Sequence, residues 1–347
     1  MDSTVLRICL GSLAVGLASQ EALSLNADVS PLQLTISTSA RSSFTQKVLQ
    51  EAGSVQEMEA LGFLITHMPD ADIKTLSVEF VVENTRLALA AYNSTSWAAS
   101  VPWEIFLNDV LPYACFTEPR EAGRADFFRR FLPAVEGADN LTVAAVTMNT
   151  VAWDVTSPRI RFIAAPSDEV NNYSPSQVMN GTFTQGRPGG SCTSCAVFFV
   201  AACRAVGIPA RVAGVPHWNK GFATCPHGDS DEQCGDHNWA EVWADGAWHF
   251  VDPAGDLRLD HGWFYPGSTH FQVPGTTNHS IFATSWAPPS MLPEALYPNS
   301  SPANTTGYHY PMVWHWPSDY GLDWNTGWQW NVDTVPAWDV TCRYKEC

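Results

Sequence analysis

The sequence predicts an α+β fold, in which a helical N-terminal part precedes antiparallel strands. Up to about residue 208, apolar residues recur every three or four positions, as they do on amphipathic helices. Beyond that point they alternate with polar residues around turn dipeptides, which is typical of strands. Because the helices come before the strands instead of alternating with them, the order favours α+β over repeated βαβ units. The 347 residues are 45% hydrophobic and 12% aromatic, which is enough for a sizeable core.

Residues 1–18 have the pattern of a secretory signal peptide. The 13 residues after Arg7, ICLGSLAVGLASQ, carry no charge, and Gly16 and Ala18 supply a small-residue cleavage site. The run is shorter than the roughly 20 residues that span a bilayer. We therefore expect no membrane insertion after cleavage and a secreted or extracellular protein, which in a bacterium would be periplasmic or at the cell surface. An ordinary buried N-terminal helix is the alternative.

Sequons and cysteines bear on the same compartment. Cys9 would leave with the signal peptide, and eight cysteines would remain, some of which should pair in an oxidising environment. In a eukaryotic host, the Asn-x-Ser/Thr sites would accept glycans. These sites are Asn93, Asn140, Asn172, Asn180, Asn278, Asn299 and Asn304.

The charge of the chain excludes two classes of partner. Its 18 Lys and Arg residues against 35 Asp and Glu residues give a formal net charge of −17. Such a surface repels nucleic acid and anionic membranes over most of its area. We expect neither as a partner.

Amphipathic periodicity predicts several helices in an N-terminal region, residues 19–140. Pro112 and Pro119 should interrupt the last two of them, since proline lacks a backbone donor and clashes with the preceding turn. The predicted helices lie within residues 41–68, 78–92 and 100–135.

The segment GRPGGSCTSCAVFFVAACRAVG predicts a buried helix that starts near Cys192. Its apolar run ends at Gly207, a helix stop signal. The unpaired N–H groups and positive dipole end at a helix start favour a thiolate over a thiol. Cys195 and Cys203 fall deeper in the apolar helix, where desolvation raises a thiol pKa. Position alone therefore favours Cys192 as the reactive cysteine.

The segment HNWAEVWADGAWHFVDP predicts a β-hairpin with the two-residue turn Asp245-Gly246. In that register the numbers of paired residues sum to 491, so Trp239 lies opposite Asp252. His237 then shares a face with Asp252 at a diagonal backbone separation of ~7–8 Å, within reach of a side-chain hydrogen bond. The register also puts Trp239, Trp243 and Trp248 on the His237 face, and Val242, His249 and Val251 on the other.

These two segments resemble the core of the transglutaminase-like superfamily. The matching features are GGSC at a helix start, GIPAR after that helix, HNWAEVW and then VDP, in this order. The resemblance covers roughly residues 45 to 290 and is strongest from 186 to 256. It implies a papain-like core, with Cys192 as nucleophile, His237 as general base and acid, and Asp252 orienting the imidazole. It also implies that no cofactor is required.

From this resemblance we expect a core at residues 141–260. Residues 261–347 are rich in Trp and Pro, and AWDVTCRY at 337–344 is a final candidate strand, so the composition predicts a β extension there. The implied reaction is attack of a thiolate on an amide carbonyl of a protein or peptide, giving a thioester that an amine or water resolves. A transglutaminase-like binding module without catalysis and a glycan-releasing amidase are the alternatives.

Tryptophans supply further candidate residues. The Cys192 backbone N–H and the Trp153 indole N–H could form an oxyanion hole, although Trp153 could equally belong to the core. Trp218, Trp239 and Trp243 could line a substrate groove or fill the core.

Cysteine and acidic clusters leave other readings open. Cys192 and Cys195 form a C-x-x-C motif, but the βαβ context of thioredoxin-like oxidoreductases is absent. In CPHGDSDEQCGDH the zinc-type ligands would include the histidine that the triad needs, so we favour a Cys225–Cys234 disulfide and expect no metal. A solvated acidic loop is favoured over a calcium site, because EF-hand spacing is missing. The residues concerned are Cys225, His227, Asp229, Asp231, Glu232, Cys234 and His237.

Overall fold

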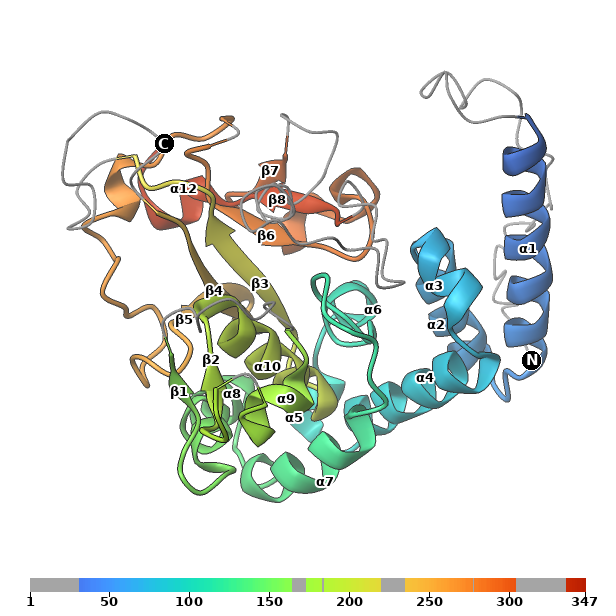
Figure 1. Ribbon diagram of the computed structural model, residues 1–347, viewed down its shortest axis with the longest axis horizontal. Coiled ribbons are helices and arrows are strands. Elements are labelled where there is room, and N and C mark those ends of the chain that lie inside the picture. The colour runs from blue at the N-terminus through green and yellow to red at the C-terminus, as the bar shows by residue number, and fades with distance from the viewer. Residues whose placement is uncertain (1–30, 164–172, 183, 220–234, 277, 304–334) are drawn as a thin grey trace, which may run out of the picture.

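The computed structural model describes residues 31–163, 173–182, 184–219, 235–276, 278–303 and 335–347, with side chains from residue 41 onward. Helices form most of the N-terminal half and antiparallel strands follow, so the predicted α+β class is confirmed (Figure 1). The predicted signal peptide and the Cys225–Cys234 pair lie outside the described residues, as do the acidic residues between them. No helix in the described ranges is long and apolar enough to cross a membrane.

The helices begin where the sequence offers capping residues. Ser54, Ser77, Asn140 and Ser191 each accept a hydrogen bond from a backbone N–H in the first helical turn. Neither predicted proline break falls inside a helix: one helix ends at Asp109, before Pro112, and the next begins at Arg124, after Pro119. The described helices are α1 Pro31–Gln50, α2 Val55–Thr66, α3 Asp70–Thr75, α4 Val78–Tyr92, α5 Ser96–Ala99, α6 Trp103–Asp109, α7 Arg124–Val135, α8 Leu141–Val151, α9 Pro175–Asn180, α10 Cys192–Ala205 and α12 Thr341–Tyr344.

The described strands form two sheets. The larger has the order β5-β4-β3-β6-β8-β7 with antiparallel neighbours, and β1 and β2 pair in parallel as a separate ribbon. The strands are β1 Arg161–Phe162, β2 Gly189–Gly190, β3 Ala210–Val215, β4 His237–Ala244, β5 Ala247–Val251, β6 Phe282–Thr284, β7 Ser301–Pro302 and β8 Ala337–Asp339.

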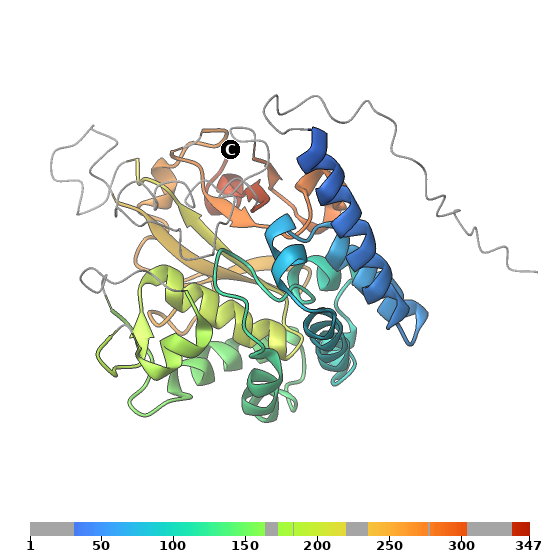
Figure 2. The ribbon, with the colours of Figure 1, turned by 45° about the vertical axis from the view of Figure 1, so that its right-hand side comes forward.

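Helix α10 lies at the centre of the fold. It packs on β3 and β4 on one side and on α4, α7, α8 and α9 on the other, whereas α1 lies at the outer edge of the molecule in both ribbon views (Figures 1 and 2). Phe198 and Phe199 are fully buried in this helix, and each such burial contributes about 1.5–3 kcal/mol. Since Gly207 has a φ of +90°, it ends the helix as expected. The helix that carries Cys192 is therefore held firmly on both sides.

The β4–β5 hairpin has the predicted register. Asp245 and Gly246 have φ angles of +50° and +78°, as a type I′ turn requires. Ala244 pairs with Ala247, and Ala240 with Val251. All eight residues of β4 are buried. This register fixes which side chains share the His237 face.

The predicted strand at residues 337–344 is only partly correct. β8 ends at Asp339, and the helical turn α12 starts at Thr341. The Asp339 carboxylate accepts hydrogen bonds from the Thr341 backbone N–H at 3.0 Å and hydroxyl at 2.6 Å. Such local side-chain bonds compete with strand pairing. A Cys342–Cys347 disulfide follows.

Candidate active site

The Cys192 side chain lies at the start of α10, directly after β2, whose backbone packs closely against that of β1. A Cβ atom on Gly189, whose φ is +145°, would lie 2.2 Å from the Arg161 carbonyl oxygen, so β1 can pair with β2 only if this residue is glycine. Ser191 is the N-cap of α10, and its hydroxyl accepts a hydrogen bond from the Ser194 N–H at 3.3 Å. Cys192 is thus the first residue of the helix, as predicted, and its thiol is partly exposed.

The other cysteines of α10 are shielded from solvent. Cys195 and Cys203 are fully buried. Burial raises the pKa of the Cys195 thiol to about 12 and that of Cys203 well above its ordinary value. Since the thiolate is the reactive form, Cys192 is the accessible candidate nucleophile of this helix.

His237, the first residue of β4, lies beside Asp252. Its Nε2 atom is 3.4 Å from the Asp252 Oδ1 atom, and both side chains are buried. Burial alone would lower the pKa of the His237 imidazole. Hydrogen bonds and charge interactions with Asp252 and Cys192 outweigh it and raise the pKa to about 9. Cys192, His237 and Asp252 therefore form one electrostatically coupled cluster.

The backbone after Asp252 is packed closely against its carboxylate. The Gly255 N–H donates to the Asp252 carbonyl at 3.0 Å, and a Cβ on Gly255 would lie 2.6 Å from the Asp252 Oδ2 atom. A Cβ on Gly262 would come within 3.3 Å of the Asp252 Cβ. These glycines hold the carboxylate toward His237. The sequence patterns did not single them out, although the motif VDPAGD contains the first.

Residues 154–253 match the family model of the transglutaminase-like superfamily. The chain contains a transglutaminase-like domain. The matched range includes Cys192, His237 and Asp252. A solved structure described as "a Putative Cysteine Protease from Cytophaga hutchinsonii" is similar at 15% identity and a TM-score of 0.31. That alignment covers 46% of this chain and 45% of the other, and a search of curated proteins finds no match.

Trp153, the predicted oxyanion donor, lies in the hydrophobic core of the protein, just before the matched range. It is fully buried and stacks on Phe199 at a ring separation of 5.5 Å. Its indole N–H donates to the Asn149 Oδ1 atom at 3.1 Å. Asn149 in turn donates to the Asp256 carbonyl at 3.1 Å, in the loop that follows Asp252. In this placement Trp153 supports the loop through Asn149 and has no N–H left for an oxyanion.

The three predicted groove tryptophans, Trp218, Trp239 and Trp243, are also buried. They fill the core instead of lining an open surface. Trp263, which the sequence analysis did not select, is 53% exposed. Its ring lies 5.0 Å from that of His237 and 5.9 Å from that of Trp218. It is therefore the exposed aromatic side chain in contact with the candidate histidine, a position that only the tertiary structure reveals.

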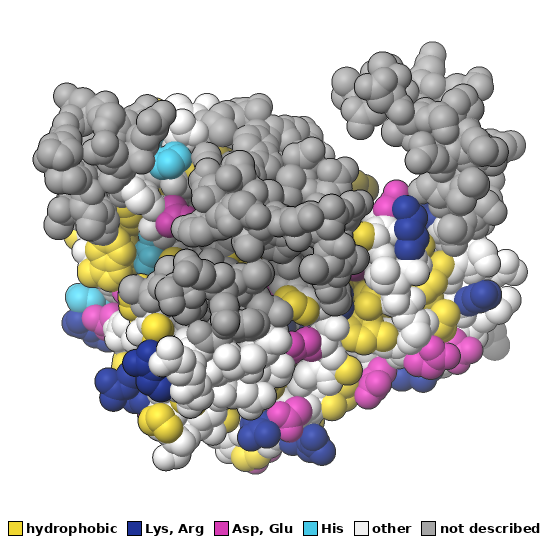
Figure 3. All heavy atoms as spheres, in the orientation of Figure 1, with side chains coloured by type: hydrophobic (Ala, Val, Ile, Leu, Met, Phe, Trp, Pro, Cys, Tyr) yellow, Lys and Arg dark blue, Asp and Glu magenta, His cyan; other side chains and the backbone are white. Residues whose placement is uncertain are grey.

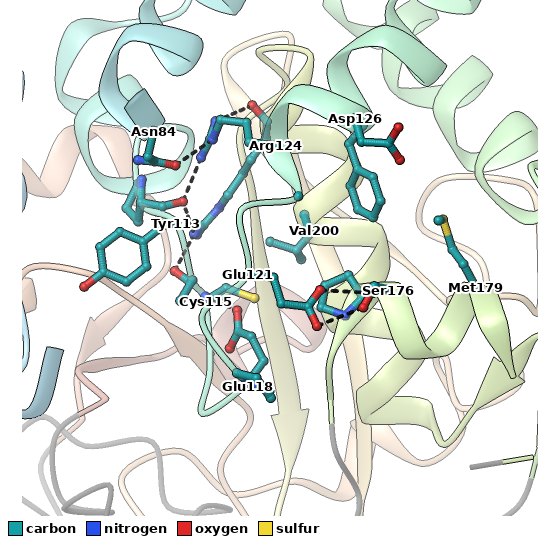
Figure 4. A pocket seen from close by; sticks show the side chains of 18 residues that line it. Asn84, Tyr113, Cys115, Glu118, Glu121, Arg124, Asp126, Ser176, Met179 and Val200 are labelled. Atoms are coloured by element: carbon teal, nitrogen blue, oxygen red, sulfur yellow. Dashed lines mark hydrogen bonds between the residues drawn. The ribbon is translucent and has the colours of Figure 1, made fainter. Parts of the chain in front are cut away.

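A separate cavity of about 110 Å³ lies at the other end of α10. Figure 4 shows its polar side chains bonded to one another, with Arg124 donating to Asn84 and Glu121 accepting from Ser176. Arg204, which also lines it, donates to the carbonyls of Ala210 and Ala114. Because these groups are already satisfied, we place the chemistry at Cys192 and not in this cavity.

No metal centre is formed by the residues that the structure describes. Among them, no three His, Cys, Asp or Glu side chains are arranged to hold a metal ion. The zinc-type set of the sequence analysis falls mainly outside these residues, with His237 as its described member.

Proposed function

We propose that Cys192, His237 and Asp252 are the catalytic triad of a thiol-dependent enzyme that acts on amide carbonyls of protein or peptide substrates. The supporting observation is the coupled cluster at the helix start, in which His237 is held 3.4 Å from Asp252 and carries a pKa raised by Asp252 and Cys192. Proximity to a thiolate and a carboxylate favours the imidazolium form. The resting pair would thus be a thiolate and an imidazolium.

The first half-reaction forms an acyl-enzyme. The Cys192 thiolate attacks the amide carbonyl carbon, and the oxyanion accepts a hydrogen bond from the Cys192 backbone N–H, a free donor at a helix start. His237 gives its proton to the leaving nitrogen as the C–N bond breaks. The products are a thioester on Cys192 and a free amine, or ammonia when the substrate is a glutamine side chain.

The second half-reaction releases the acyl group. Water or a primary amine attacks the thioester, and neutral His237 accepts its proton. The C–S bond then breaks to restore the thiolate and imidazolium. Asp252 keeps the ring in the tautomer that both halves need.

The test distinguishes a protein with a reactive thiol from a binding module that has the same fold but no catalysis. We expect an iodoacetamide probe to label the wild type and the Cys195→Ala and Cys203→Ala variants, but not Cys192→Ala. Cys195→Ala and Cys203→Ala are the matched controls, because each removes a different thiol of the same helix. Ammonia release from a glutamine peptide, measured with and without a primary amine, then distinguishes transamidation from hydrolysis.

Two outcomes would defeat this proposal. Labelling that survives in Cys192→Ala would move the reactive thiol elsewhere. A wild type that resists the probe and releases no product would instead favour the binding-module alternative.

We further propose that the protein is secreted. The Cys342–Cys347 disulfide supports an oxidising compartment. Four of the sequon asparagines, Asn93, Asn140, Asn180 and Asn299, are exposed and could accept glycans in a eukaryotic host. N-terminal sequencing of the mature protein tests the cleavage expected after residue 18.

A further inference from the structure

The β1–β2 ribbon and the residues just before β2 carry positive charge that no carboxylate in the described part of the chain neutralises. Arg161 and Arg187 are exposed and have no carboxylate partner among the described residues. The other described arginines are buried or paired with acidic side chains, apart from half-buried Arg124, which donates to backbone carbonyls. The Arg187 Nε atom donates to the Thr184 carbonyl at 3.2 Å, a bond that leaves its charge unneutralised. In a chain of net charge −17, Arg161 and Arg187 thus form a basic site at the β1–β2 ribbon.

The backbone of this basic site adjoins the helix that carries the candidate nucleophile. The Arg161 N–H donates to the Pro188 carbonyl at 3.3 Å, so Arg161 in β1 lies near Arg187, which precedes β2 by two residues. The Arg161 carbonyl is 3.9 Å from the Cys195 Sγ atom, one helical turn from Cys192. Figure 3 shows Lys and Arg side chains on this part of the surface, over the strands that Figure 1 labels β1 and β2.

We propose that Arg161 and Arg187 bind an acidic segment of the polypeptide substrate next to the amide that Cys192 attacks. This rests on the proposed function and specifies its substrate class. Guanidinium groups match carboxylates in charge and in bidentate geometry. The occupant is a short peptide segment and not a long polyanion, because a chain of net charge −17 repels extended negative charge.

Binding to the Cys192→Ala protein tests this inference without turnover. The probes are fluorescent glutamine peptides with two glutamates on one side of the reactive residue, on the other side, or replaced by neutral glutamines. We expect one acidic peptide to bind about fivefold tighter than the neutral one at low salt, as two exposed ion pairs allow. The preference should shrink as salt increases.

Arg161→Gln and Arg187→Gln, introduced together, should abolish the preference. Arg159→Gln is the matched control, because this exposed neighbour is already paired with Asp154 at 3.2 Å. Equal affinity for all peptides, an equal loss in the control, or tighter binding of heparin than of any acidic peptide would overturn the inference. A failure of the proposed amide chemistry would appear in the ammonia-release assay, whereas a failure of this inference would appear in the peptide-binding assay. The two failures can therefore be distinguished.

A second inference concerns the C-x-x-C pair. Residues three apart in an α-helix have Cα atoms about 5 Å apart, which is within the range that a disulfide spans. Cys195 Sγ points back toward the helix start, with the Gly190 carbonyl at 3.5 Å. Cys192 is partly exposed, whereas Cys195 is fully buried beneath it. An oxidant would therefore meet Cys192 first.

We infer that Cys195 resolves oxidised Cys192 and so makes peroxide inactivation reversible. The Cys192 thiolate attacks one oxygen of hydrogen peroxide, which breaks the O–O bond and leaves a sulfenic acid and hydroxide, and the hydroxide takes the His237 proton to become water. Cys195 sulfur then attacks the sulfenic sulfur, the S–O bond breaks, and the hydroxide leaves with the Cys195 proton as water. In total, two thiols lose two hydrogens while peroxide is reduced to two waters.

Mass spectrometry of the peroxide-treated protein tests this step independently of turnover. We expect the wild type and Cys203→Ala to lose two hydrogens in a 192–195 disulfide and to recover probe labelling with dithiothreitol. Cys195→Ala should instead gain two oxygens at Cys192 and stay unlabelled. Irreversible oxidation of the wild type, at the same rate as Cys195→Ala, would overturn the inference.

Discussion

The Nε2 atom of His237 lies 3.4 Å from the Oδ1 atom of Asp252, although the two residues are 15 positions apart in the chain. The β4–β5 hairpin brings these two residues next to each other. Its turn sets Ala240 opposite Val251, so the residue after β5 falls beside the start of β4. The contact therefore depends on turn chemistry as much as on the two side chains.

We expect Asp252→Asn to keep the fold and lower turnover by orders of magnitude. An amide cannot stabilise the imidazolium or fix the required tautomer, and the equivalent change in a serine-protease triad costs ~10⁴-fold. Circular dichroism and steady-state kinetics measure the two effects. Asp245→Asn, the same change at the exposed turn of the hairpin, should leave both unchanged. Equal activity of the two variants would remove Asp252 from the triad.

The raised pKa of His237 predicts a pH dependence. In the folded protein the pKa is about 9, against 6.5 ordinarily, so folding binds the proton more tightly. The resulting stabilisation is complete below pH 6.5 and disappears as the pH rises through about 9. Turnover should fall over the same upper limb, since the leaving nitrogen needs the His237 proton. NMR titration of the imidazole measures the pKa, which should drop in Asp252→Asn; an unchanged value would contradict this explanation.

Gly255→Ala should impair catalysis through the position of Asp252. The added Cβ would stand 2.6 Å from the Asp252 Oδ2 atom, so the carboxylate must turn away from His237. We expect kcat to fall at least about tenfold and the pKa of His237 to fall with it. Gly267→Ala is the control, because nothing lies within 4 Å of its added Cβ. Wild-type kcat in Gly255→Ala would show that the carboxylate orientation is not limiting.

Trp263→Ala should raise KM more than it lowers kcat. Its exposed ring, 5.0 Å from that of His237, offers apolar surface to a chain entering the site. The increase should be largest for peptides with an apolar residue next to the reactive amide. Phe271→Ala, another exposed aromatic of the same segment, is the comparison. If the two substitutions change KM equally, Trp263 has no specific role at the site.

Local signals made much of the site predictable. The glycines before Cys192 and the Asp245-Gly246 turn determine backbone conformation within a few residues, so the helix start and the hairpin register followed from the sequence. The environment of Trp153 did not, because it depends on Asn149, which bonds a residue 107 positions away. The burial of Trp218 and the exposure of Trp263 are likewise set by tertiary packing, and residue type carries no signal for either.

Asp252 lies just beyond the end of β5, whereas Cys192 and His237 begin elements that are buried along most of their length. The loop after Asp252 has no regular helix or strand, and many of its hydrogen bonds are exposed, such as those between Arg258 and Asp256. Amide hydrogens of α10 and β4 should exchange with solvent only through global unfolding, but those of the loop through a cheaper local opening. On warming, the protein would then lose any activity of this site reversibly, at temperatures where its helices and sheet are still intact.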